Sequence, residues 1–588
     1  MNEGNFVDAE LLLKKNIDIN PDDADSFLNL GCVLKELGKN NEAVVFLNKA
    51  LKLKPNFLNA YINLGAVLNE LGKFKEAEES LIKALKIDPN SALAHNNYGN
   101  LLSSQERIQE ALGCYKKAIQ IKPDFALANN NLGTILSTLG KVEESLKFFK
   151  HAVTLNPNFE LALVNLGITE LELNNIKNAE KCFLRAIEVK QDYQFAYSNL
   201  FRLYEKINNI KKLKEVLKTN ENNPKIKNEV NMFNARVLFR EKKFAAAKSS
   251  IDCISEKWIK ETDQSSKLLF WSFKAFIEDK NKNYDIAYKY FSQSQLNPKY
   301  EKFNAKLFQE YINDYGKCID RKPFTVSKSD LYPNSNTVFL IGFPRSGTTL
   351  LDTILRSHPD VDVLEEKPIL NSVEEIIKSD FKYSLKEIYK LKKDEIIILR
   401  KKYLKDLKLN SDKEKNAKLI IDKFPFQTVS LPLINLLFPD AKIIFTHRNP
   451  YDTVLSCFQQ AFEPNNAMSN FKTIHSTAYI YDLTMKMWDK YKQQLDMDYT
   501  MSKYENLVDN FEDHILHILN FLNLPWDENL RNYRDTAFNR EKINTPSSSQ
   551  VIQPIYKSSI AKWKNYEKYF YQSHGYLQKW LDYFDYKT

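Results

Sequence analysis

The chain has 588 residues, of which 43% are hydrophobic and 27% charged, so it is long enough for two or more domains and ordinary in composition for a globular protein. Its net charge of +9 arises from Lys residues interleaved with Glu and Asp, and without a clustered basic stripe we expect no nucleic-acid-binding role. No run of 18 apolar residues occurs, and the N-terminus lacks a basic region followed by an apolar core, so we expect neither secretion nor a membrane span.

The six Cys residues are scattered singly along the chain, with no CxxC pair and no His at metal-ligand spacing beside them. That pattern predicts no zinc-type site. Unpaired thiols are typical of a reducing compartment. The sequence therefore predicts a cytoplasmic protein without a metal.

Residues 21–190 repeat with a period of 34 residues. Small residues at this period let two helices approach closely, and a proline begins the next helix hairpin. The repeated positions are Pro21, Pro55, Pro89, Pro123 and Pro157, then Gly31, Gly65, Gly99, Gly133 and Gly167, then Ala50, Ala84, Ala118, Ala152 and Ala186. The pattern resembles the tetratricopeptide repeat (TPR), which implies hairpins stacked into a superhelix with a concave groove.

The stretch 191–330 keeps helical periodicity but loses the regular Pro and Gly. We interpret it as degenerate TPR-like helices that cap the array and pack it against the next domain. The predicted domains are thus regular repeats over 1–190, degenerate repeats over 191–330, and a catalytic domain over 331–588.

An asparagine recurs at one repeat position six times, two residues before the glycine of each regular repeat. Asn is a mediocre helix former, so the recurrence needs a reason. The ladder resembles that of O-GlcNAc transferase, where such side chains hold a peptide backbone, and an amide offers both a donor and an acceptor. The resemblance implies a polypeptide partner in the groove; the alternative is that the amides are merely solvated. The ladder consists of Asn29, Asn63, Asn97, Asn131, Asn165 and Asn199.

From about residue 331 apolar strands alternate with helices, which is typical of a parallel α/β sheet. Strands are predicted at 338–342, 418–422, 442–447 and 499–505. The expected fold class is therefore multidomain, with an all-α TPR superhelix followed by an α/β, P-loop-like domain. Active residues in such a sheet should lie at the carboxyl ends of the strands.

The segment 343–349 joins the first of these strands to a helix. Its N–H groups and the positive end of the helix dipole converge on an anion. The spacing from Gly342 to Gly347 resembles a nucleoside-triphosphate P-loop, but Thr348 stands where that loop has Lys, which disfavours a kinase or nucleotidase. The predicted anion-binding residues are Pro344, Arg345, Ser346, Gly347, Thr348 and Thr349.

A second anion site is predicted at the end of the strand 442–447. Arg448 supplies a fork of donors that suits a dianion, and Ser456 follows eight residues later on a helix. Together with PRSGTTLL about 100 residues upstream, this pair resembles the sulfotransferases that use 3′-phosphoadenosine 5′-phosphosulfate (PAPS). The resemblance implies PAPS as donor, PAP as product, no metal, and a 3′-phosphate held by Arg448 and Ser456.

The resemblance also assigns catalytic roles. Glu365-Glu366 is similar to the paired Glu of tyrosylprotein sulfotransferases, which makes Glu366 the base that takes the acceptor proton. Lys423 would stabilise the leaving phosphate, and Arg345 would lie beside the sulfonate. If Glu366 is not the base, His447 or Glu365 is the next candidate.

The C-terminal part resembles the signature TxSxxQVxxPIY…WxxYE of bacterial TPR-sulfotransferases. The resemblance implies that Ser547 and Lys562 contact the cofactor phosphates and that Tyr504 contacts the nucleotide. Residues 372–415 have helical spacing and are interpreted as an inserted helical pair over the acceptor mouth.

The predicted function is transfer of the sulfuryl group from PAPS to an acceptor hydroxyl. Protein tyrosine is the favoured acceptor because of Glu366 and the peptide-like groove. Lys367-Pro368 stand where tyrosylprotein enzymes typically carry Thr and Arg, which leaves carbohydrate or small-metabolite hydroxyls open. A TPR scaffold with a catalytically silent nucleotide-binding domain is the alternative from another class, and a homodimer is left open.

Overall fold

The computed structural model describes residues 3–320, 336–411, 417–539 and 553–586. By internal contacts the chain divides into two compact units, Met1–Val230 and Asn231–Thr588. The division falls inside the stretch 191–330, so helices after residue 230 pack with the α/β unit. The boundary expected at 330/331 lies outside the described residues.

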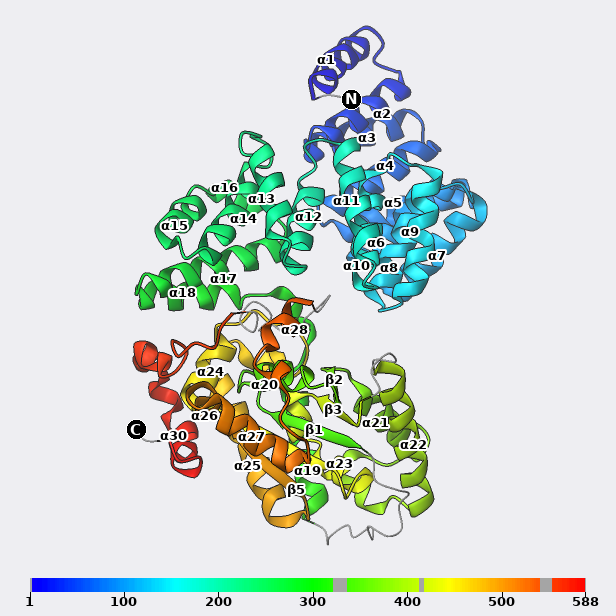
Figure 1. The fold of residues 1–588 in the computed structure, drawn as a ribbon. Helices are drawn as coiled ribbons and strands as arrows, with labels where there is room; N and C mark the ends of the chain where they lie inside the picture. The colour runs from blue at the N-terminus through cyan, green and yellow to red at the C-terminus, as the bar shows by residue number, and fades with distance from the viewer. Residues whose placement is uncertain (1–2, 321–335, 412–416, 540–552, 587–588) are drawn as a thin grey trace. The chain divides into compact units, whose positions relative to one another are not determined.

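The first unit is a stack of antiparallel helix hairpins (Figure 1). The repeat prolines lie in the turns that precede the first helix of a hairpin, where a missing N–H costs nothing. This confirms the predicted helical array. Its elements are α1 (Glu3–Ile19), α2 (Ala24–Glu36), α3 (Asn40–Leu53), α4 (Leu58–Glu70), α5 (Phe74–Ile87), α6 (Ala92–Ser104), α7 (Ile108–Ile121), α8 (Ala126–Thr138), α9 (Val142–Leu155), α10 (Glu160–Glu172), α11 (Ile176–Val189), α12 (Gln194–Lys206) and α13 (Ile210–Thr219).

The repeat glycines mark the point where the two helices of a hairpin touch. A Cβ added at any of them would lie only 2.5–2.8 Å from a side chain sixteen residues later. That side chain is Leu47 or Leu81 in the first two hairpins and Tyr115, Phe149 or Phe183 in the next three. Glycine is therefore required by close packing, since no larger residue fits beside the partner side chain.

The second unit opens with helices that continue the hairpin pattern. They are α14 (Lys227–Arg240), which crosses the division, α15 (Phe244–Asp252), α16 (Glu256–Glu261), α17 (Gln264–Lys280), α18 (Tyr284–Ser294), the 3₁₀ segment η1 (Pro298–Lys302) and α19 (Ala305–Ile319). α19 is anchored to the α/β part by Tyr311 and Tyr315, whose hydroxyls each donate to Glu374 Oε1 at 2.7 Å.

Five parallel strands form the sheet, in the order β2-β3-β1-β4-β5. Their bounds are β1 (Thr337–Gly342), β2 (Val361–Glu365), β3 (Leu419–Lys423), β4 (Lys442–His447) and β5 (Asp498–Lys503). The four predicted strands are present: the bounds of β4 are as predicted, and those of the other three differ by at most two residues. β2 was not predicted, because a five-residue strand interrupted by Asp362 lacks a clear apolar run.

Alternate residues of β1 enter two different cores. Phe339 and Ile341 join the larger cluster, while Val338 and Leu340 join a smaller one. The sheet is thus covered on both faces (Figure 1), as parallel sheets require. The covering elements are α20 (Thr348–Arg356), α21 (Ile369–Ser379), η3 (Leu385–Lys390), α22 (Lys393–Asn410), η4 (Pro425–Thr428), α23 (Leu431–Leu437), α24 (Pro450–Phe458), η5 (Met468–Phe471), α25 (Ile474–Gln494), α26 (Tyr504–Asp509), α27 (Phe511–Leu522), η6 (Glu528–Leu530), α28 (Tyr533–Asn539), η7 (Lys562–Ser573) and α30 (His574–Tyr583).

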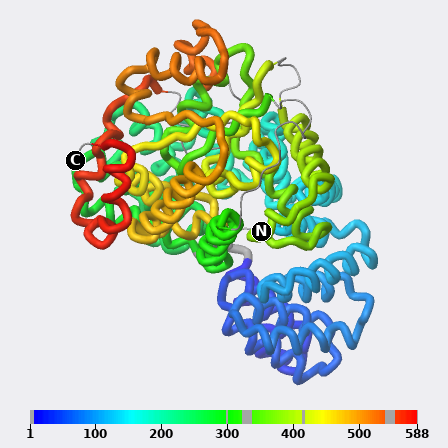
Figure 2. Tube along the Cα trace, turned by 90° about the horizontal axis from the view of Figure 1, so that it is seen from below, coloured from blue at the N-terminus to red at the C-terminus, as the bar shows by residue number. Residues whose placement is uncertain are grey.

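The C-terminal helix α30 lies against α24 and α25 (Figure 2). Trp580 Nε1 donates to Asp482 Oδ1 of α25 at 2.9 Å, and the Tyr451 hydroxyl of α24 is hydrogen-bonded to His574 Nδ1 at 2.9 Å. Among the described helices, none is both long enough and apolar enough to cross a bilayer.

Candidate active site

The loop after β1 leads into the N-terminus of α20, where the backbone N–H groups of the first helical turn lie. Its N-cap, Gly347, has φ 100° and provides no side-chain cap. A Cβ at Gly347 would lie 2.8 Å from Cδ2 of Tyr504, so both the backbone and the packing require glycine. The first N–H groups of an uncapped helix attract an anion. The loop therefore suits the role predicted for residues 344–349.

Ser346 braces this loop. Its hydroxyl donates to Phe343 O at 2.7 Å and is hydrogen-bonded to Thr446 Oγ1 at 2.9 Å, and its N–H reaches Phe343 O at 3.2 Å. A Cβ at Gly342 would lie 2.5 Å from Thr446 O, so the loop is pressed onto β4. Ser346 thus stabilises the conformation of the loop after β1 through hydrogen bonds within the protein.

Two arginines face each other across the ends of β1 and β4. Arg345 Nε donates to Ser456 Oγ at 3.0 Å. Arg448 Nη2 donates to Ser559 O at 2.5 Å, and its guanidinium lies 4.8 Å from the ring centre of Tyr504. Burial lowers the pKa of Arg345, and the positive charge of Arg448 lowers it further. Two buried cations in proximity are stabilised by an anion between them.

Two donors of this cluster lack a partner among the described residues. Nε of Arg448 is buried without a hydrogen bond among the described residues, and so is Nε2 of Gln459, at the end of α24. A buried donor without an acceptor costs free energy. Both donors, with the arginine charges, fit a phosphate group at this place.

Lys423 and Glu366 meet at the ends of β2 and β3. Lys423 Nζ is fully buried and lies 2.9 Å from Glu366 Oε1, 3.5 Å from Glu365 Oε1 and 3.9 Å from Asp352 Oδ2. Glu366 N donates to Lys423 O at 2.8 Å, and Glu366 has φ 49°. Glu366 is one-third exposed, so its carboxylate is reached from solvent while the ammonium is not.

The other candidate bases are placed differently. His447 is buried against Phe584 and Tyr586, with Nδ1 3.1 Å from the Tyr586 hydroxyl. Burial lowers the pKa of His447 to about 3, and the charge of Lys503 adds to the lowering. Glu365 is buried at the end of β2. Of the three, Glu366 combines exposure with proximity to Lys423.

The family comparisons match both parts of the chain. A model described as "Sulfotransferase family" matches residues 337–528, and tetratricopeptide-repeat models match 33–72, 56–124, 114–147 and 161–193. Residues 337–528 are a sulfotransferase-family domain. The chain joins this domain to tetratricopeptide repeats.

Curated relatives of the chain include enzymes of animals. An uncharacterised protein of Aquifex aeolicus is 32% identical over 40% of this chain and 32% of its own length. Protein-tyrosine sulfotransferase A of Caenorhabditis elegans is 24% identical over 45% of this chain and 70% of its own length. Protein-tyrosine sulfotransferase 1 of Danio rerio is 25% identical over 38% of this chain and 65% of its own length. The chain thus spans about a third of the Aquifex protein and about two thirds of the two animal enzymes.

Solved structures similar to part of the chain include a protein described as a TPR protein. YrrB, described as a TPR protein with an unusual peptide-binding site, is 26% identical over 31% of this chain and 95% of its own, with a TM-score of 0.24. PilF of Pseudomonas aeruginosa is 21% identical over 35% of this chain and 95% of its own, with a TM-score of 0.31.

Lys562 lies close to the arginine pair but is engaged elsewhere. Its Nζ is 2.9 Å from Asp279 Oδ2 and donates to Gln459 Oε1 at 3.1 Å. Tyr504 is hydrogen-bonded through its hydroxyl to Ser559 Oγ at 2.9 Å. Ser547, the remaining predicted phosphate contact, lies outside the described residues.

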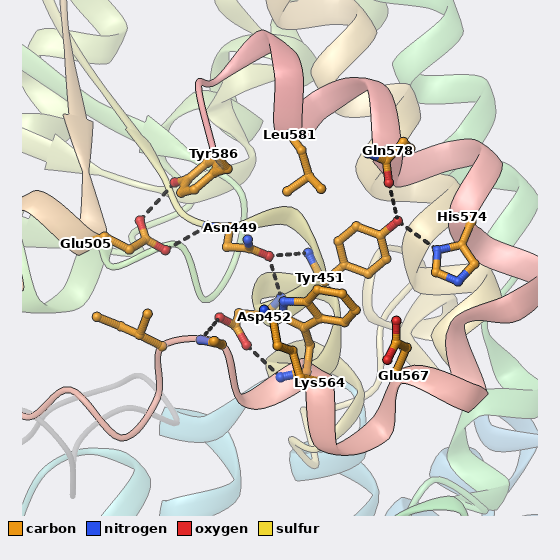
Figure 3. A pocket seen from close by; sticks show the side chains of 13 residues that line it. Asn449, Tyr451, Asp452, Glu505, Lys564, Glu567, His574, Gln578, Leu581 and Tyr586 are labelled. Carbon is orange, nitrogen blue, oxygen red and sulfur yellow. Dashed lines mark hydrogen bonds between the residues drawn. The ribbon is translucent and has the colours of Figure 1, made fainter. Parts of the chain in front are cut away.

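A pocket of about 490 Å³ opens between α24 and the C-terminal segment, beside the predicted second anion site (Figure 3). Its polar groups are largely paired: Asp452 accepts from the N–H groups of Ala561 and Trp563, and Glu505 accepts from Asn449 N and the Tyr586 hydroxyl. Neither Glu366 nor Lys423 lines it, so the pocket is separate from the proposed chemistry.

The Asn ladder lies on the first helices of successive hairpins, and part of it is bonded internally. Asn131 Nδ2 donates to Asn96 Oδ1 and Asn100 Oδ1, both at 3.0 Å, and Asn165 Nδ2 donates to Asn130 Oδ1 at 2.9 Å. These amides connect one hairpin to the next. Asn63 and Asn199 bond to the carbonyl four residues earlier, and Asn29 is exposed.

Two site residues were missed by the sequence analysis. Gln459 and Asp279 both contact Lys562. Gln459 follows Ser456 by three residues, so helical spacing could have placed both on one face. Asp279 is 283 residues away from Lys562 in sequence, and no local pattern connects them.

Proposed function

We propose that the chain is a PAPS-dependent sulfotransferase whose acceptor is a protein tyrosine. The supporting observation is that one edge of the sheet combines the uncapped start of α20, the arginine pair, and the Lys423–Glu366 pair. The first two suit the two phosphate ends of a nucleotide such as PAPS. The third suits the transfer of a group between the donor and a hydroxyl.

Each residue then has a chemical task. Glu366 takes the proton of the acceptor hydroxyl as that oxygen bonds to sulfur and the bond from sulfur to the donor phosphate breaks. Lys423 and Arg345 stabilise the charge on the departing phosphate oxygen and on the sulfonate. Arg448 and Ser456 hold the 3′-phosphate, and the N–H groups at 347–349 hold the 5′-phosphate. No metal is required by this scheme.

Two observations support a polypeptide acceptor. The curated relatives of the chain include proteins named protein-tyrosine sulfotransferases, and the repeats carry the Asn ladder. Lys367-Pro368, directly after Glu366, count against tyrosine because the Thr and Arg typical of tyrosylprotein enzymes are absent there, and they leave carbohydrate or small-metabolite hydroxyls open as acceptors. The partner proposed for the repeats is the polypeptide substrate itself.

The test uses the purified full chain with labelled PAPS. We expect PAP to raise the melting temperature and label to enter protein from a lysate, in alkali-stable form as tyrosine sulfate. AMP, which lacks the 3′-phosphate, serves as the control and should stabilise less. Label in carbohydrate or small molecules would overturn the tyrosine assignment alone. PAP binding without any transfer would indicate a silent scaffold.

Replacing Asn97, Asn131 and Asn165 together by Ala should lower kcat/KM for a polypeptide acceptor about tenfold or more, since each of the three lost amide contacts is worth about 0.5–1.5 kcal/mol. PAP affinity should stay within about twofold, because the repeats are remote in sequence from the donor residues. Circular dichroism must show intact helices, since Asn131 and Asn165 also link hairpins. Unchanged kcat/KM with intact helices would remove the Asn ladder from substrate binding.

A further inference from the structure

The hairpin α17–α18 packs on the segments that surround the second anion site. Gln295, just after α18, donates through Nε2 to Phe458 O at 2.8 Å and to Gln460 O at 3.1 Å. Tyr288 stacks on Tyr569 of η7 with ring centres 3.6 Å apart. The end of α24, which carries Ser456 and Gln459, is thereby fixed to a helix hairpin that lies outside the matched sulfotransferase region.

Asp279, in the last turn of α17, is the charged group of this contact. Its side chain is almost fully buried; Oδ1 accepts from the Tyr566 hydroxyl at 2.6 Å, and Oδ2 lies 2.9 Å from Lys562 Nζ. Gln459 Oε1 accepts the second hydrogen of that ammonium. An ammonium has three hydrogens, so with these two partners among the described residues one hydrogen remains for a ligand.

We propose that Asp279 is a positioning residue of the donor site, which holds Lys562 charged and aimed at the phosphate bound by Arg448. This inference rests on the proposed function. It makes α17–α18 a wall of the donor site, so that a helix of the repeat type contributes to cofactor binding through Lys562.

The electrostatics explain why Lys562 needs such a partner. Burial lowers the pKa of Lys562, the carboxylate of Asp279 raises it, and the charges of Lys280 and Arg448 lower it. Asp452 of α24 also faces the group: burial raises its pKa, and Arg448 and Lys562 lower it. Without Asp279, Lys562 would be a desolvated amine beside two cations, and it would lose its proton or turn away.

The test is the affinity of the full chain for PAP, measured by calorimetry across pH 7 to 10. Asp279→Asn should weaken PAP binding about tenfold, the loss expected for a charge-assisted hydrogen bond. Because only the protonated ammonium binds phosphate, affinity falls as pH passes the pKa of Lys562. Removing the Asp279 charge lowers that pKa, so the fall should begin at lower pH in the variant.

The matched control is Asp285→Asn. Asp285 of α18 also bonds to η7, through Lys568 at 2.7 Å and Tyr569 at 2.8 Å, but the pair is exposed and away from the arginines. The Asp285→Asn substitution should leave PAP affinity and the pH dependence of that affinity unchanged. In a Lys562→Met background, which should itself bind PAP more weakly, Asp279→Asn should add less than about a twofold further loss, as residues that act through one another are not additive.

The outcomes separate the two proposals. PAP binding that Asp279→Asn leaves unaltered at every pH overturns the positioning role and leaves the proposed function standing. Equal losses in Asp279→Asn and Asp285→Asn, or an undiminished Asp279→Asn effect without Lys562, also overturn it, since the contact would then be merely structural. Failure of the unsubstituted chain to bind PAP overturns both.

Discussion

Replacing Glu366 with Gln should lower kcat about a thousandfold and leave PAP affinity within about twofold, because it removes a general base worth about 10²–10⁴ in rate. Gln keeps the shape of Glu and can still accept a hydrogen bond from Lys423, but it cannot take a proton. The measurements are initial rates with labelled PAPS at saturating donor and calorimetry with PAP.

Glu365→Gln is the matched control for this result. It removes a carboxylate 3.5 Å from the same ammonium, from a buried position on β2. We expect it to lower kcat far less than Glu366→Gln does. If Glu366→Gln keeps its rate and Glu365→Gln loses it, the base is Glu365 and the assignment by exposure is wrong.

Replacing Arg448 with Met should raise the Kd for PAP about a hundredfold or more, because two charge-assisted hydrogen bonds to a dianion are each worth about 1.5–3 kcal/mol. The Kd of Arg448→Lys for PAP should lie between those of the unsubstituted chain and Arg448→Met, since Lys keeps the charge but loses the paired donors of the guanidinium. The decisive quantity is the ratio of the AMP and PAP dissociation constants, which should approach one in Arg448→Met.

Arg531→Met provides the comparison for Arg448→Met. Arg531 is an exposed cation paired with Glu512 and Glu528, so its loss changes the net charge equally without touching the arginine pair. We expect no change in either dissociation constant. A loss of AMP affinity as large as that of PAP in Arg448→Met would mean that Arg448 does not contact the 3′-phosphate.

The sequence predicted the edge of the sheet where these residues meet, because parallel strands bring their carboxyl ends together. Glu366, Lys423, Arg448 and Tyr504 each stand at or directly after the end of a strand. The order of the strands was not predictable, since it depends on which helices cross over which face. β2 was not predicted because it is only five residues long and Asp362 interrupts its apolar run.

Contacts between distant segments could not be predicted. The pairing of Lys562 with Asp279 and the seating of Tyr311 and Tyr315 on Glu374 join residues without any shared pattern. The hydrogen bonds between Asn side chains of neighbouring hairpins were only weakly indicated by the sequence, since the additional asparagines, Asn96 and Asn130, occur in only two repeats. Periodicity predicted the position of the Asn ladder and could not show that its members bond to one another.

The glycine contacts of the hairpins bear on how the array unfolds. Leu side chains fill the contact in the first two hairpins, and Tyr or Phe fill it in the next three. An aromatic ring buries more apolar surface than Leu does, and each repeat is stabilised chiefly by itself and its neighbours. We expect the array to open progressively from its N-terminal end. Amide hydrogen exchange should show faster opening in α2–α5 than in α6–α11, and uniform exchange throughout would contradict the gradient.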